Sequence, residues 1–142
     1  MINIKAKLLI INLLIILLST GCGVTPPPLE FAPQPPVIEK AIALTLDNQY
    51  NYLSDKLQTK PLKFEITKIK INKIEPTLIL NLPTYHLKGT YQIKLTLNQI
   101  KNKIVINKFE IDLQRGKKGQ TWRLIVPYKD NKQNKYFSYQ LR

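Results

Sequence analysis

The sequence holds one histidine and one cysteine, and these two residues have the widest chemical repertoire in the chain. His86 falls on the polar side of a predicted strand, where an imidazole could act as a general base. No second histidine is present to complete a metal site, and the cysteine lies far away at position 22. We therefore interpret His86 as a surface residue.

Acidic pairs and nucleophile motifs give no stronger indication of catalysis. Asp47 and Asp55 are eight residues apart in a predicted helix, and we interpret them as solvated charges. Glu110 and Asp112 share one face of a predicted strand, where cross-strand pairing with Arg123 explains them. The sequence contains neither a G-x-S-x-G elbow nor a glycine-rich phosphate loop. We expect no enzymatic activity, no cofactor and no metal site.

The cysteine ends a stretch with the pattern of a secretory leader. Residues 1–7 carry two lysines and no acid, and residues 8–18 are apolar except for Asn12. A helix of that apolar length rises about 16 Å, roughly half the hydrocarbon thickness of a bilayer, so it is too short to span permanently. Ser19, Thr20 and Gly21 then place small residues directly before Cys22, as at a leader cleavage site.

Residues 18–22, LSTGC, resemble the lipobox of bacterial lipoproteins, with Ser19 where an apolar residue is usual. The resemblance implies that a signal peptide, residues 1–21, is removed and that Cys22 becomes the lipidated first residue. Two or more acyl chains anchor a protein stably, at about 0.8 kcal/mol per buried CH₂. We expect a lipid-anchored protein on the extracytoplasmic side of a membrane, periplasmic or at the cell surface.

A proline-rich segment follows the cysteine, with six prolines in residues 23–36. Such segments favour polyproline II at about 3.1 Å per residue, so we predict a tether, residues 22–36, that holds the domain about 40 Å from the bilayer. A docking ligand for an aromatic groove is the alternative. The remaining residues, 37–142, suit one small domain.

The chain is strongly basic, with a formal net charge of +13 that falls to +11 once Lys5 and Lys7 leave with the leader. A basic balance suits anionic lipids, acidic polymers or nucleic acid, and export makes nucleic acid the least expected partner. Isoleucine, lysine and asparagine also have codons rich in A and T, so genome composition is an alternative source of the lysines.

Hydrophobic spacing predicts one helix at residues 37–58, bracketed by Pro36 and Pro61. Its apolar stripe is Ile38, Ile42, Leu46, Leu53 and Leu57.

From Leu62 the period changes to two and predicts strands at residues 62–71, 85–97, 104–115, 120–128 and 136–141. A phase slip predicts a bulge near Thr67 and Lys68. Gly89 suggests a bend or the close approach of a partner such as the helix. Connections are predicted at Glu75 and Pro76, at 99–103, at 116–119 as a hairpin, and at 130–135 as a polar loop. Residues 78–82 are a short apolar run that Pro83 ends, and we interpret them as a strand end.

One helix followed by about four to six antiparallel strands predicts an α+β fold with the helix on one sheet face. The order resembles the cystatin-like and NTF2-like half-cone folds, an analogy that implies no activity. Residues 85–91, 109–115 and 121–124 are similar to stretches of uncharacterised cyanobacterial lipoproteins, over about a third of the chain. That resemblance implies an envelope protein without an assigned activity.

The most promising surface is cationic. Alternation puts a set of basic side chains on the polar sheet face and at the hairpin tip: Lys88, Lys94, Arg115, Lys117, Lys118 and Arg123. They could face anionic lipid, an anionic polymer or an acidic envelope complex, or they could serve only solubility and edge protection. Two functional hypotheses follow: a lipid-anchored binding or accessory module, and a carrier with a small apolar or anionic ligand between helix and sheet.

Overall fold

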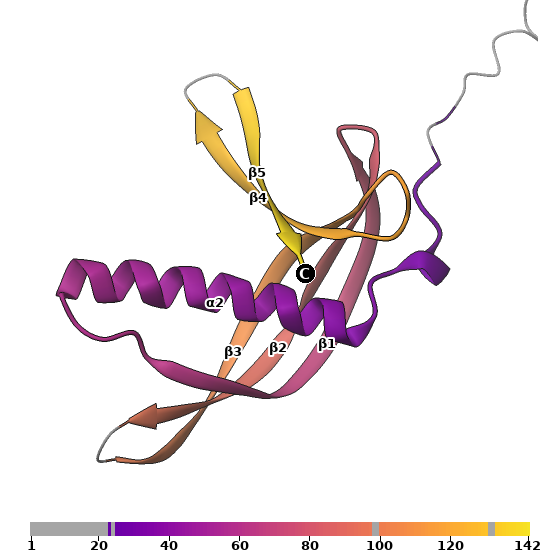
Figure 1. Ribbon diagram of the computed structural model, residues 1–142. Helices are drawn as coiled ribbons and strands as arrows, with labels where there is room; N and C mark the ends of the chain where they lie inside the picture. The colour runs from indigo at the N-terminus through magenta and orange to yellow at the C-terminus, as the bar shows by residue number, and fades with distance from the viewer. Residues whose placement is uncertain (1–22, 24, 98–99, 131–132) are drawn as a thin grey trace, which may run out of the picture.

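The computed structural model describes residue 23 and residues 25–97, 100–130 and 133–142, so the predicted leader and Cys22 lie outside the described residues. In chain order the elements are η1 (Leu29–Phe31), α2 (Pro35–Leu57), β1 (Lys63–Ile79), β2 (Leu82–Leu97), β3 (Ile100–Arg115), β4 (Trp122–Asp130) and β5 (Gln133–Leu141). The strands form one antiparallel sheet in sequence order, and α2 lies across one face (Figure 1). The predicted α+β fold with an open half-cone sheet is confirmed. None of the described helices has the length and hydropathy needed to cross a bilayer.

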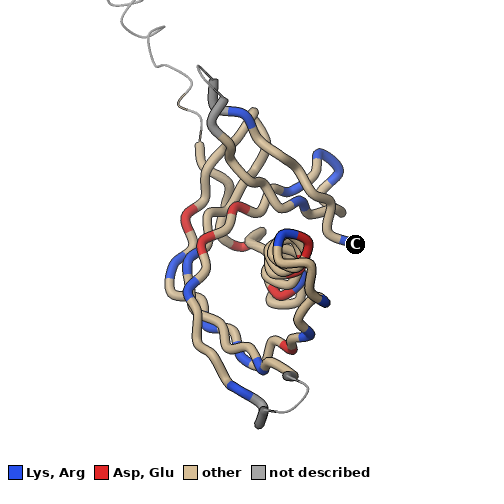
Figure 2. The backbone as a smooth tube through the Cα atoms, turned by 90° about the vertical axis from the view of Figure 1, so that its left-hand side faces the viewer, with Lys and Arg blue, Asp and Glu red and all other residues tan. Residues whose placement is uncertain are grey.

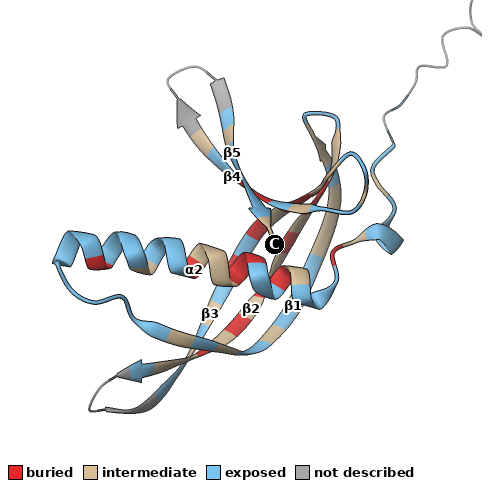
Figure 3. Cartoon of the chain, viewed as in Figure 1, coloured by how far each residue is buried: buried red, intermediate tan, exposed pale blue. Residues whose placement is uncertain are grey.

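The helix starts at Pro35 and Pro36, which suit the first turn because they lack the N–H groups that would be unpaired there. It ends at Leu57, and the cap residue Gln58 has a left-handed φ of 51°. The first half of the predicted stripe is buried, but Leu53 and Leu57 are exposed. Figure 3 shows why, since the second half of α2 projects beyond the part of the sheet that holds the buried side chains.

β1 and β2 form a long hairpin, which confirms one prediction and contradicts two others. The bulge near Thr67 is confirmed by a register shift, and a second shift occurs between Ile71 and Lys73. No turn occurs at Glu75 and Pro76, because Pro76 lies inside β1 opposite Tyr85. β1 is an edge strand, where a missing N–H on the outer side leaves no partner unpaired. The chain reverses instead at Leu80 and Asn81, both with positive φ, and Pro83 lies inside β2.

β3 and β5 are longer than predicted, and β4 keeps the predicted length but is shifted by two residues. β3 starts at Ile100, β4 extends to Asp130 and β5 starts at Gln133, so most of the predicted turn at 99–103 and loop at 130–135 is strand; residues 98–99 and 131–132 lie outside the described part. β3 pairs with β4 only from Asp112 to Arg115, whereas β4 and β5 pair along their length. The β4–β5 hairpin therefore diverges from β1–β3, as Figure 1 shows.

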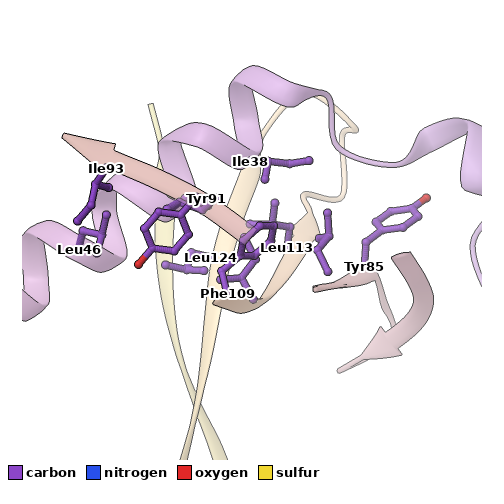
Figure 4. Close-up of a cluster of buried hydrophobic side chains, with 12 residues drawn as sticks. Ile38, Leu46, Tyr85, Tyr91, Ile93, Phe109, Leu113 and Leu124 are labelled. Atoms are coloured by element: carbon purple, nitrogen blue, oxygen red, sulfur yellow. The ribbon is translucent and has the colours of Figure 1, made fainter. Parts of the chain in front are cut away.

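The core lies between α2 and the inner sheet face, which is the face toward the helix (Figure 4). Alternate residues of β2 and β3 supply most of it, and this confirms the predicted alternation: Ile38, Ala41, Ile42, Leu46, Tyr85, Leu87, Tyr91, Ile93, Phe109, Ile111, Leu113 and Leu124. Gly89 is closely approached, but by the Phe109 ring and the Lys70 carbonyl and not by the helix.

Candidate functional site

The structure divides the predicted cationic surface into three parts. Lys88 and Lys94 lie on the outer sheet face, which points away from α2, since the buried residues of β2 alternate with them. Lys117, Lys118 and Arg123 lie together around the 116–119 connection, where they line one hollow with Gln114.

Arg115 belongs to neither group, because its side chain lies on the inner face. Its guanidinium is 5.2 Å from the ring centre of Phe31 and 6.0 Å from that of Trp122. Its Nε donates a hydrogen bond of 3.0 Å to the Gly119 carbonyl oxygen. These contacts pack Arg115 against the N-terminal segment and fix the hairpin.

The outer face carries four lysines beyond those predicted. The cross-strand register places Lys68, Lys70 and Lys73 of β1 and Lys108 of β3 beside the outward residues of β2. We name the whole set the lysine face: Lys68, Lys70, Lys73, Lys88, Lys94 and Lys108. Figure 2 shows these basic positions as a run along the sheet, next to a smaller acidic region.

Two of these lysines are neutralised and the rest are not. Lys73 Nζ lies 2.7 Å from Glu75 Oε1, and Lys88 Nζ lies 2.9 Å from Glu110 Oε1. Within the described residues the other four lysines make no ion pair. Lys70 and Lys108 flank Thr90 in one row across three strands, so their backbones are about 10 Å apart. This row is the centre of the uncompensated positive charge.

His86 lies at the acidic edge of the lysine face and is not an isolated surface histidine. Its Nδ1 is 2.7 Å from Asp112 Oδ1, its Nε2 is 3.0 Å from Glu110 Oε1, and its side chain is only 24% exposed. A carboxylate only accepts hydrogen bonds, so both contacts are made when both ring nitrogens carry a proton. The expected pairing of these acids with Arg123 is wrong, because Arg123 lies opposite Gln114 and Gln140 in the register.

The charges of this edge hold one another in their ionised forms. The hydrogen bond from Lys88 lowers the pKa of Glu110 and in turn raises the pKa of Lys88. The hydrogen bond from Lys73 likewise lowers the pKa of Glu75. Among the described residues, no three His, Cys, Asp or Glu side chains are arranged to hold a metal ion. The arrangement is therefore a network of ion pairs across three strands.

A hollow lies between α2 and β3, where a carrier would hold its ligand. It encloses about 180 Å³ and is lined by apolar residues such as Leu46 and Tyr91 together with polar ones such as Gln49 and Lys108. Sites for drug-sized ligands have roughly 300–1,000 Å³. On the sheet side of this hollow, Tyr91 and Ile93 are buried in the core.

The proline-rich segment does not stand away from the domain along its whole length. Tyr85 Oη donates a hydrogen bond of 2.7 Å to the Pro28 carbonyl oxygen, and burial raises the pKa of this phenol. Phe31 lies against Arg115, and Pro33 is buried. Pro28 is therefore already in contact with the domain, so the predicted spacer is shortened to at most residues 22–27, which would reach about 20 Å at 3.1 Å per residue.

No protein-family model, curated protein or solved structure matches the chain significantly. The class that the structure itself defines is an α+β domain with a helix on an open, five-stranded antiparallel sheet.

Proposed function

We propose that this protein is a lipid-anchored, extracytoplasmic binding module of the cell envelope, without catalytic activity. The observation that carries the proposal is the LSTGC sequence at residues 18–22, which combines a short apolar stretch with the chain's only cysteine. A lipidated Cys22 would join the domain through at most six residues, because the segment from Pro28 onward packs on Tyr85 and Arg115. The tether is therefore short, and the domain works close to its membrane.

The binding surface of this module is the lysine face, and its partner is an acidic protein or an anionic polymer of the envelope. Lys68, Lys70, Lys94 and Lys108 present charge that no ion pair within the described chain offsets. An acidic partner gains both attraction and a faster encounter from such a surface. The His86 network forms the boundary of the lysine face, because an acid of that network neutralises the charge of Lys88.

The alternative, a carrier, is less well supported. The hollow beside α2 is about 180 Å³, whereas ligand sites of the expected kind need more room. A binding module needs no enclosed cavity, and the filled core between α2 and the sheet agrees with it.

Membrane fractionation of the Cys22→Ser protein tests the anchor. We expect the wild-type protein in the membrane fraction and the variant in the soluble extracytoplasmic fraction. Equal membrane retention of both proteins would reject the anchor.

Affinity purification from solubilised envelope tests the lysine face. The Lys70→Glu/Lys108→Glu variant should lose acidic partners that the wild type retains. The matched control is Lys40→Glu/Lys60→Glu, which makes the same change in net charge at exposed positions away from this face. Recovery of the same partners by the lysine-face variant would reject the surface, and so would equal loss in both variants.

A further inference from the structure

Three connections that are distant in sequence meet at one end of the molecule. The 116–119 hairpin shares one hollow with Asn81 of the β1–β2 turn and with Leu82 and Pro83 at the start of β2, and Arg115 lines it. Arg115 also lines a second hollow with Glu30 and Phe31 of the η1 region. Figure 1 shows all three on the side from which the N-terminal segment leaves the domain. We name this the tether end: η1, the β1–β2 turn and the 116–119 hairpin.

The tether end exposes large apolar side chains that are not part of the hydrophobic core, although Phe31 also contacts Arg115. Leu29 is 57% exposed, Phe31 is 48% exposed and Leu80 is 77% exposed. Leu80 sits in a two-residue turn at φ 53°, a left-handed conformation that suits Asn or Gly much better than Leu. An exposed leucine in a strained turn contributes nothing to the core, and such outliers concentrate at functional sites.

Cations lie at the same end of the molecule: Lys117 and Lys118 share a hollow with Asn81, the neighbour of Leu80. Lys117, Lys118 and Arg123 line a common hollow at the hairpin. Among the described residues of the tether end, the acidic residue is Glu30, and it lies beside Arg115. Exposed apolar side chains together with Lys and Arg are the combination with which peripheral proteins enter a membrane interface that contains anionic lipid.

We propose that the tether end is a membrane-contact surface for anionic phospholipid. Leu29, Phe31 and Leu80 enter the headgroup region, and the Lys117, Lys118 and Arg123 side chains lie against lipid phosphates. The inference rests on the proposed lipid anchor, which brings this end to the bilayer through at most six residues. Its consequence is a fixed orientation, because one end of the domain faces the membrane while the lysine face of β1–β3 is left for a partner.

Vesicle co-sedimentation tests the contact without the anchor. The probe is the chain from Gly23 to Arg142, since every core contact and strand pair described above lies within it. Vesicles contain phosphatidylglycerol mixed with phosphatidylcholine, or phosphatidylcholine alone. We expect binding to the anionic vesicles, and about twenty-fivefold weaker binding for Lys117→Gln/Lys118→Gln, at about fivefold per lysine. The matched control Lys70→Gln/Lys108→Gln, with the same charge, should bind within about twofold of the wild type.

Leu80→Gly separates membrane contact from folding. Glycine adopts a positive φ without strain, so this variant should unfold at a higher urea concentration and yet bind anionic vesicles about tenfold more weakly. Binding that is unchanged in Leu80→Gly, absent from anionic vesicles, or lowered as much by the control pair as by the hairpin pair would overturn the proposal. Because the probe lacks Cys22, a failure here leaves the fractionation result of Cys22→Ser standing, and a failure of the anchor leaves vesicle binding standing.

Discussion

Gly89 is the position where the fold tolerates a side chain least. It lies in β2 between Ile71 of β1 and Phe109 of β3. A Cβ at this position would overlap the Lys70 carbonyl oxygen and would lie 2.7 and 2.8 Å from Cε1 and Cζ of Phe109. Two carbon atoms in contact sit at about 3.5–4.0 Å, so the ring would have to move by about 1 Å while a backbone carbonyl is displaced as well.

Gly89→Ala should therefore destabilise the protein by about 3 kcal/mol. Overpacking a filled core costs about 1–3 kcal/mol, and the upper end applies because Phe109 is buried and one of the obstructing atoms belongs to the backbone. For a domain of this size the melting temperature should fall by about 10 °C. Gly23→Ala is the control, since a Cβ there would meet nothing within 4 Å.

Urea unfolding followed by the fluorescence of Trp122, the single tryptophan, measures the effect. A double-mutant cycle with Phe109→Leu adds a sharper test, because removal of the ring should recover at least about 1 kcal/mol of the cost of Gly89→Ala. The steric argument would be refuted by a loss below about 0.5 kcal/mol, or by a Gly89→Ala cost that is the same in the wild-type and Phe109→Leu backgrounds.

Three further predictions concern polar contacts. The hydrogen bond from Lys88 lowers the pKa of Glu110 from its ordinary value of 4.5. The Lys88–Glu110 ion pair therefore stabilises the fold fully above pH 4.5, and this stability is lost as the pH falls through the lowered pKa. The urea midpoint should drop in acid, and it should drop less steeply in Glu110→Gln. Tyr85→Phe removes a hydrogen bond to the N-terminal segment and should cost about 1 kcal/mol, with faster chymotrypsin cleavage of that segment. Gln114→Leu leaves the Ile79 carbonyl oxygen without its 2.9 Å donor and should cost about 1–3 kcal/mol in the same urea assay. Unchanged midpoints, or parallel acid profiles for Glu110→Gln and the wild type, would contradict these predictions.

The features of the fold that follow a repeating pattern were predictable from the sequence. Alternation along β2 identifies Tyr85, Leu87, Tyr91 and Ile93 as core residues, because a half-buried strand exposes every second side chain. The phase slip at Thr67 likewise reveals the bulge, since one extra residue moves the buried set to the other parity. Local periodicity was enough in both cases.

Features that depend on the pairing register between strands could not be predicted from local periodicity. Pro76 suggests a turn by itself, and only its place on an edge strand explains why β1 continues to a turn at Leu80. Asp112 becomes a partner of His86 because β3 pairs with β2 at that register. Two bulges in β1 decide which of its lysines join the outer face, although extending the alternation past the first bulge would have found Lys68 and Lys70.

Mass spectrometry of the intact protein purified from membranes tests the lipid anchor directly. We expect a chain that begins at Cys22 and carries diacylglycerol on that residue, with an added acyl chain where the α-amino group is modified. A membrane-associated chain that keeps Met1, or that begins elsewhere with an unmodified Cys22 thiol, would contradict it.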